Sequence, residues 1–183
     1  MVNFIWENFH RVADRKKNIE ALLADNALFS GLRSRELKII REMVHERHYR
    51  SGERVFKEGE IGIGMYIVVR GGVTITTQNL DVLAGAEPET IVTHLQEGDF
   101  FGEVSLVEQN GHRSASAWAS KDSILLGFFK PDLMALIERH PAIGVKVVFR
   151  LAEVLGRRLR ETTEKITSLK MDLKRSKDPS TSA

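Results

Sequence analysis

A series of short apolar runs, rich in β-branched and aromatic residues, fills the middle of the chain and constrains its fold more than any other feature. Glycines stand between successive runs, so that most runs end near a residue that favours a turn. Short strands at regular intervals, joined by glycine-rich turns, are typical of a β-barrel or a β-sandwich. We therefore expect one of these two architectures. Its expected strands cover 55–56, 65–69, 73–77, 91–95, 114–119 and 124–129.

Helical periodicity flanks this region on both sides. In the first 27 residues, apolar side chains recur at helical spacing around a charged cluster and predict one amphipathic helix. Its apolar face could meet a membrane surface or a partner protein, but packing against its own domain is the simpler role. A second helix is expected after Ser34, and a third at Pro131, because proline fits the first turn of a helix. The predicted fold class is therefore α+β.

The longest helix is predicted to begin at Pro141 and to continue to about Arg175. Along it, one stripe of residues is spaced by alternating steps of four and three, which is a heptad seam. The seam residues are Val148, Ala152, Leu155, Leu159, Thr162, Ile166, Leu169 and Leu173. Packing of this seam on the chain's own barrel is one reading, but its length favours pairing with a second copy of the helix. We therefore expect a homodimer.

These patterns divide the chain into four parts. The N-terminal helix covers 1–27, the strand-rich domain 28–140 and the long dimerisation helix 141–175. Residues 176–183 are polar and are expected to form a disordered tail. Inside the strand-rich domain, the segment 79–89 is expected to be an exposed hairpin loop.

The composition excludes several classes of function. None of the 183 residues is cysteine, which excludes disulfide scaffolds and thiol catalysis and agrees with a reducing, cytoplasmic location. The 27 basic and 25 acidic residues are interspersed, so no cationic surface for nucleic acid is expected. The sequence shows neither a signal peptide nor a run apolar enough to span a membrane. Its histidines are scattered and no catalytic arrangement is recognisable, so we expect neither a bound metal nor an enzyme.

The residues best suited to bind a ligand lie in the sequence FGEVSL over 101–106 and in RSA over 113–115. Gly102 would let backbone N–H groups approach an anion, Arg113 is a forked donor suited to phosphate, and Ser114 adds a hydroxyl. Glu103 would repel a phosphate, but it could accept a hydrogen bond from a sugar hydroxyl. The expected ligand is a small anion that carries both phosphate and ribose. Spacing alone leaves equally open that Glu103 and Arg113 simply pair with each other across a surface loop.

Two motifs resemble those of a known family. The sequence GEIG over 59–62, followed by MYIV over 65–68 and by Gly71, resembles the first β-roll signature of the cyclic-nucleotide-binding domain. The FGEVSL and RSA segments resemble the phosphate-binding cassette of the same domain. Ten positions separate Glu103 from Arg113, as in the bacterial catabolite activator family. The resemblance extends over most of the chain, from Leu28 to Leu173, and implies that the strands form an antiparallel, jelly-roll-like β-roll.

The resemblance implies a ligand and a role for individual residues. The ligand would be cAMP, with cGMP as a possibility. Arg113 would pair with the cyclic phosphate, while Glu103 and the Gly102 backbone would hold the ribose 2′-hydroxyl. Two neighbouring hydroxyl residues on the long helix would contact the adenine, one from each subunit. The other residues carried over are Val104 and Ser114 in the cassette, Ile75 and Leu95 beside the base, Arg158 as partner of Glu103, and Thr162 and Thr163 for the adenine.

The chain departs from the catabolite activators after the long helix. Those proteins continue into a helix-turn-helix domain, whereas ten residues follow Leu173 here, so we expect no direct binding to DNA. The expected function is a stand-alone cyclic-nucleotide sensor that transmits a conformational change to an unknown downstream protein. Two other hypotheses stay open: a scaffold that uses the same fold without a nucleotide, and a regulatory subunit of a separate enzyme.

Overall fold

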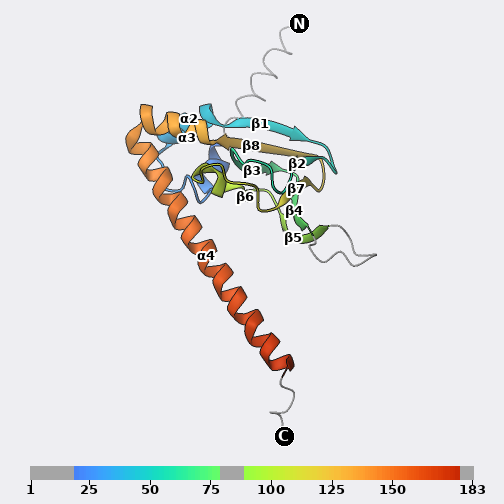
Figure 1. The fold of residues 1–183 in the computed structure, drawn as a ribbon. Coiled ribbons are helices and arrows are strands. Elements are labelled where there is room, and N and C mark those ends of the chain that lie inside the picture. The colour runs from blue at the N-terminus through green and yellow to red at the C-terminus, as the bar shows by residue number, and fades with distance from the viewer. Residues whose placement is uncertain (1–18, 79–88, 178–183) are drawn as a thin grey trace.

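The computed structural model describes residues 19–78 and 89–177, and their strands form two four-stranded antiparallel sheets. The strand orders are β1-β8-β3-β6 and β2-β7-β4-β5 (Figure 1). The strands are β1 (His45–Tyr49), β2 (Arg54–Phe56), β3 (Gly64–Arg70), β4 (Val73–Gln78), β5 (Glu89–Leu95), β6 (Phe100–Phe101), β7 (Ser116–Ala119) and β8 (Ser123–Phe129). The helices are α2 (Ser34–Met43), the short 3-10 helix η1 (Glu103–Leu106), α3 (Lys130–Arg139) and α4 (Pro141–Lys177), and residues 19–25 are also helical.

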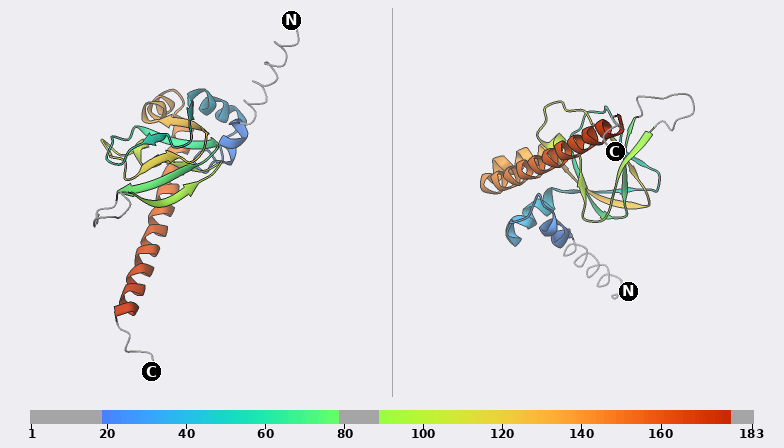
Figure 2. Two further views of the ribbon diagram at one scale, coloured as in Figure 1. Left: turned by 90° about the vertical axis from the view of Figure 1, so that its right-hand side faces the viewer. Right: turned by 90° about the horizontal axis from the view of Figure 1, so that it is seen from below.

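The two faces of the first sheet enter different apolar cores. Because successive side chains of a strand point to opposite faces, Leu125 and Leu126 of β8 belong to separate clusters. Leu125 joins residues of both sheets, such as Val73 and Ala117, in a core between the sheets. Leu126 joins side chains of α2, α3 and α4 in the larger core. The helices therefore cover the outer face of one sheet, as the two views of Figure 2 show.

The predicted fold class is confirmed, and all six expected strands overlap observed ones. Two observed strands had not been predicted. Strand β1 has the polar sequence HERHY and lies at a sheet edge beside β8, where exposed side chains are tolerated. Strand β6 has only two residues, which is too short for an alternating pattern. Residues 1–18, 79–88 and 178–183, which hold most of the predicted first helix, hairpin loop and tail, lie outside the described residues.

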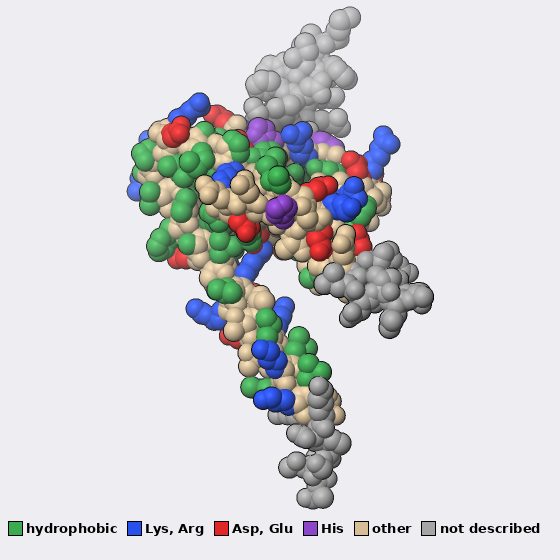
Figure 3. Space-filling view, in the orientation of Figure 1, with side chains coloured by type: hydrophobic (Ala, Val, Ile, Leu, Met, Phe, Trp, Pro, Cys, Tyr) green, Lys and Arg blue, Asp and Glu red, His purple; other side chains and the backbone are tan. Residues whose placement is uncertain are grey.

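Helix α4 has two parts with different surroundings. Its first turns bury Ile143, Val147 and Leu151 against the larger core. Its C-terminal part projects beyond the strands (Figure 1), and hydrophobic side chains lie along its surface (Figure 3). The seam residues Leu159 and Leu169 are 69% and 62% exposed, so this part of the seam does not pack on the chain's own barrel. Within the two described ranges, no helix combines the length and the apolar character needed to cross a membrane.

Candidate functional site

A cavity of about 430 Å³ opens between the second sheet, the η1 turn and helix α4. This volume lies in the range of small-molecule sites, roughly 300–1,000 Å³. Eight of the ten predicted site residues line it: Ile75, Leu95, Gly102, Glu103, Val104, Arg113, Ser114 and Arg158. The fold thus brings together residues from β4, β5, the cassette and α4 that are far apart in the sequence.

Gly102 shapes the turn that begins the cassette. Its φ of +77° lies in the left-handed region, where a side chain is strained, and it directly precedes η1. A Cβ at this position would also lie 2.5 Å from Nη1 of Arg113. The glycine is therefore required both by the backbone conformation and by the close approach of the guanidinium.

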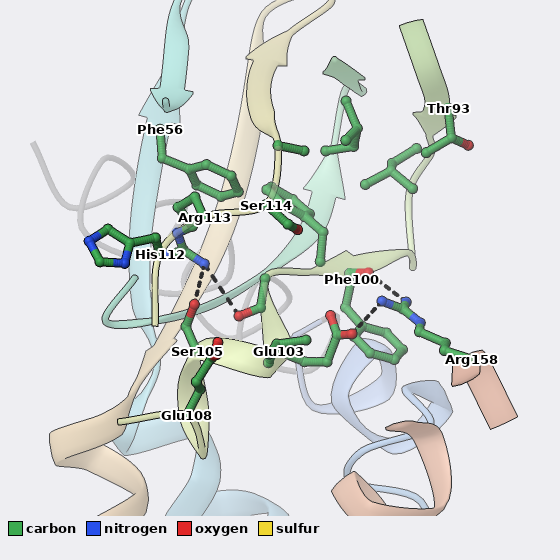
Figure 4. A pocket seen from close by; sticks show the side chains of 16 residues that line it. Phe56, Thr93, Phe100, Glu103, Ser105, Glu108, His112, Arg113, Ser114 and Arg158 are labelled. Carbon is green, nitrogen blue, oxygen red and sulfur yellow. Dashed lines mark hydrogen bonds and ion pairs between the residues drawn. The ribbon is translucent and has the colours of Figure 1, made fainter. Parts of the chain in front are cut away.

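Arg113 is a buried cation. Its exposed fraction is 7%, and burial lowers the pKa of its guanidinium, although arginine keeps its proton in proteins. Nη1 donates hydrogen bonds to Ser105 Oγ at 3.0 Å and to the Gly102 carbonyl oxygen at 3.3 Å (Figure 4). The guanidinium also lies over the ring of Phe56, with Cζ 4.0 Å from the ring centroid. Among the described residues, no carboxylate forms an ion pair with it.

Glu103 is buried as well, with 3% of its surface exposed, and its partner comes from α4. Arg158 Nη1 donates to Glu103 Oε1 at 2.6 Å, and Arg158 Nη2 donates to the Phe100 carbonyl oxygen at 3.1 Å. The same guanidinium lies 4.7 Å from the Phe100 ring centroid. The alternative that Glu103 and Arg113 pair with each other is therefore wrong. Glu103 instead connects the cassette to the long helix.

The two ends of the cavity differ in chemistry. Figure 4 shows Arg113 and Glu103 at the cassette, with Thr93 on the other side of the cavity. Ile75 and Leu95, which are half-buried, line the cavity together with Thr93. One end can thus hold an anion and accept a hydrogen bond from a hydroxyl, while the other offers apolar surface to a flat ring.

The structure does not bring Thr162 and Thr163 into the cavity wall. Both side chains are exposed, and their hydroxyls donate to backbone carbonyl oxygens one turn earlier, at Arg158 and Leu159. Thr162 lies one helical turn beyond Arg158, which does line the cavity. Contact between these threonines and a ligand stays a prediction.

Sequence reasoning missed three residues that shape the site. Ser105 lies inside the cassette motif, but its bond to Arg113 depends on the η1 turn. Phe56 and Phe100 each support an arginine through the face of a ring. Aromatic residues in short strands are usually interpreted as core, so no local signal marks these two as site residues. No group of three or more His, Cys, Asp or Glu residues that could hold a metal is found within residues 19–78 and 89–177.

Comparisons with known proteins find one matching family and several similar proteins. Residues 46–140 match the family described as cyclic nucleotide-binding domain. The cyclic AMP receptor protein of Thermus thermophilus is 37% identical over 134 residues, which are 73% of this chain and 57% of that protein. The type II regulatory subunit of the cAMP-dependent protein kinase of Drosophila melanogaster is 28% identical over 62% of this chain and 28% of that subunit.

A solved structure has a similar fold. The Thermus thermophilus catabolite activator protein superposes with a TM-score of 0.69 at 36% identity, over 79% of this chain and 63% of that chain. The chain thus spans less than two thirds of the length of these relatives.

Proposed function

We propose, from the premise that this chain belongs to the cyclic nucleotide-binding domain family, that it binds cAMP in the cavity and relays the binding to another protein. The observation that carries this proposal is the burial of the Arg113 guanidinium without a carboxylate partner among the described residues. A guanidinium that is 7% exposed and has no carboxylate partner among the described residues is a costly arrangement. An anionic ligand that pairs with it would offset that cost.

The other groups of the site fit the rest of a cyclic nucleotide. The cyclic phosphate would accept hydrogen bonds from Arg113 and from Ser114, whose exposed hydroxyl lines the cavity. The Glu103 carboxylate would accept a hydrogen bond from the ribose 2′-hydroxyl while Arg158 holds it in place. Ile75 and Leu95 would contact the purine. Each of these roles is a proposal for the residue named.

The ion pair between Glu103 and Arg158 suggests how binding would be relayed. It joins the cassette to α4, because Arg158 Nη1 lies 2.6 Å from Glu103 Oε1. A ligand that engages Glu103 would bind one arrangement of cassette and helix more tightly than another. Such a difference in affinity is sufficient to shift the population of α4 positions, which a partner can detect.

Replacing Gly102 by alanine should weaken cAMP binding, whereas the same change at Gly98 should not. Both glycines have positive φ, +77° and +91°, so each variant should lose roughly 1–2 kcal/mol of stability. A Cβ at Gly102 would displace the Arg113 guanidinium, whereas a Cβ at Gly98 would meet nothing within 4 Å. Calorimetric titration and thermal unfolding of both variants measure the two effects. Equal cAMP affinity in the two variants would contradict the assignment of Gly102 to the site.

Changing Thr162 and Thr163 together to alanine should weaken cAMP binding. It should also reduce the factor by which the protein binds cAMP more tightly than cGMP. Loss of one or two hydrogen bonds to the adenine corresponds to roughly a three- to thirtyfold change in affinity. The exposed Thr167, which also donates to a carbonyl oxygen one turn earlier, offers a matched control on the same helix. Titration of the double variant and of Thr167→Ala with both nucleotides measures the effect. An unchanged double variant would remove the adenine role from these threonines.

The proposed function itself is tested by titrating the full chain with cAMP, cGMP and a cyclic dinucleotide. We expect saturable binding of cAMP, with weaker binding of the other two. A pull-down from a lysate, with and without the nucleotide that binds best, then identifies what receives the signal. A separate enzyme captured only with nucleotide would assign the chain as a regulatory subunit. Absence of binding to all three nucleotides would overturn the proposal in favour of a scaffold.

A further inference from the structure

We propose that Phe56 is a positioning residue for the anion site: its ring holds the Arg113 guanidinium in place without neutralising it. This inference deepens the proposed function, on which its role in binding rests. Phe56 ends β2, 57 positions before Arg113 in the sequence, and neither motif of the cassette includes it. The two residues meet only because the fold brings β2 against the cassette.

The contact has the geometry of a cation–π interaction. Cζ of Arg113 lies 4.0 Å from the ring centroid of Phe56, well inside the roughly 6 Å within which such pairs attract. Both hydrogen bonds of the guanidinium use Nη1, which leaves the Nη2 and Nε hydrogens free of protein acceptors within the described residues. Figure 4 shows the ring of Phe56 beside the guanidinium and the two hydrogen bonds on another side. The arginine is thus held while part of its donor fork stays available.

The ring is itself held firmly. Phe56 is paired with Ala117 of β7, and its ring centroid lies 5.7 Å from that of Phe101 and 6.2 Å from that of Tyr66. Tyr66 and Phe101 stack on each other at 5.6 Å, so the three rings form one cluster. An aromatic support of this kind resists rotation of the side chain that it carries, because each ring is packed by the other two.

An aromatic face suits this position better than an acidic side chain would. A carboxylate beside Arg113 would stabilise the buried guanidinium more strongly, but it would also occupy its donors and repel an incoming phosphate. A ring attracts the cation through its quadrupole and presents no competing anion. We infer that Phe56 lets the protein bury a charged arginine before the ligand arrives and keep it oriented.

Binding measurements test the proposal through coupling between the two residues. Phe56→Leu should lower cAMP affinity about tenfold, while Phe56→Tyr, which keeps the ring, should stay within about threefold of the parent. In the parent protein, Arg113→Lys removes an oriented pair of N–H donors. In the Phe56→Leu variant these donors are no longer oriented, so Arg113→Lys should lower the cAMP affinity by a smaller factor there than in the parent. Trp118→Leu removes a ring that lies beside Arg54 and outside the cavity, so its effect should add to that of Arg113→Lys. If Phe56→Leu and Arg113→Lys lower the cAMP affinity independently, so that their effects add in free energy, the positioning role of Phe56 would be overturned.

A measurement without ligand separates this inference from the proposed function. In the free protein, the Nε–H signal of Arg113, assigned by its absence in Arg113→Lys, should show an upfield ring-current shift in the parent and in Phe56→Tyr. The shift should disappear in Phe56→Leu. A parent protein that shows the shift but binds no cyclic nucleotide would overturn the proposed function and leave the support of Arg113 standing. A parent signal without the shift would overturn the inference even if cAMP binds.

Discussion

Replacing Arg113 by leucine should lower the affinity for cAMP by at least about 100-fold, which is the loss expected for two charge-assisted hydrogen bonds of about 1.5 kcal/mol each. The effect should be large because, among the described residues that line the cavity, no second arginine is free to take over. Arg158, the other arginine that lines the cavity, is committed to Glu103 and Phe100. Isothermal titration calorimetry of the variant with cAMP measures the loss.

Two further variants define what that loss means. Arg113→Lys keeps the charge without the fork, and it should fall between the parent and Arg113→Leu in affinity. Arg54→Leu is a matched control, because Arg54 also lies over an aromatic ring, that of Trp118, but is exposed and lies outside the cavity. Its cAMP affinity should equal that of the parent. Thermal unfolding should show that Arg113→Leu remains folded. A folded Arg113→Leu variant with unchanged cAMP affinity would contradict the site assignment.

The parts of the fold that could be predicted from sequence are those whose signal is local. Runs such as 65–69 and 124–129 are short, rich in β-branched or aromatic residues and end at glycines or charged residues, which together indicate a strand. In the structure their side chains alternate between the two cores. The cassette is local as well, since Gly102 begins the η1 turn and Arg113 follows within the same segment. Five of the eight predicted site residues that line the cavity belong to the cassette, whereas Ile75, Leu95 and Arg158 were predicted from the family resemblance.

The parts that could not be predicted depend on contacts between distant segments. Spacing along the chain left the partner of Glu103 open, and only the family resemblance pointed to Arg158, which lies 55 positions away on a helix whose placement depends on the larger core. The role of Phe56 was hidden for the same reason, since it depends on how β2 meets the cassette. Strand β1 is polar because it lies at an edge, so its register comes from β8 and not from its own pattern.

Introducing glutamate at both Leu159 and Ile166 should abolish the dimer that the heptad seam predicts. In the single chain Leu159 is 69% exposed and Ile166 is 48% exposed. The seam residues Leu169 and Leu173, further along the helix, are exposed as well. Burying a leucine or isoleucine side chain against a second helix contributes about 1.5–3 kcal/mol, and a glutamate at the seam would also place like charges opposite each other. Sedimentation velocity should show a dimer for the parent and a monomer for the double variant at high micromolar concentration.

The matched control for the seam is Met171→Glu. Met171 is 56% exposed on the same part of α4, but it is not a seam position, so this variant should remain a dimer. Because one of the two threonines proposed to contact the adenine would come from the second subunit, the monomeric variant should also lose the part of the cAMP affinity that this threonine supplies. Its affinity should then fall toward that of the Thr162→Ala and Thr163→Ala double variant. A monomeric parent would show that the heptad spacing had been misinterpreted, and a monomer with full cAMP affinity would show that each subunit completes its own site.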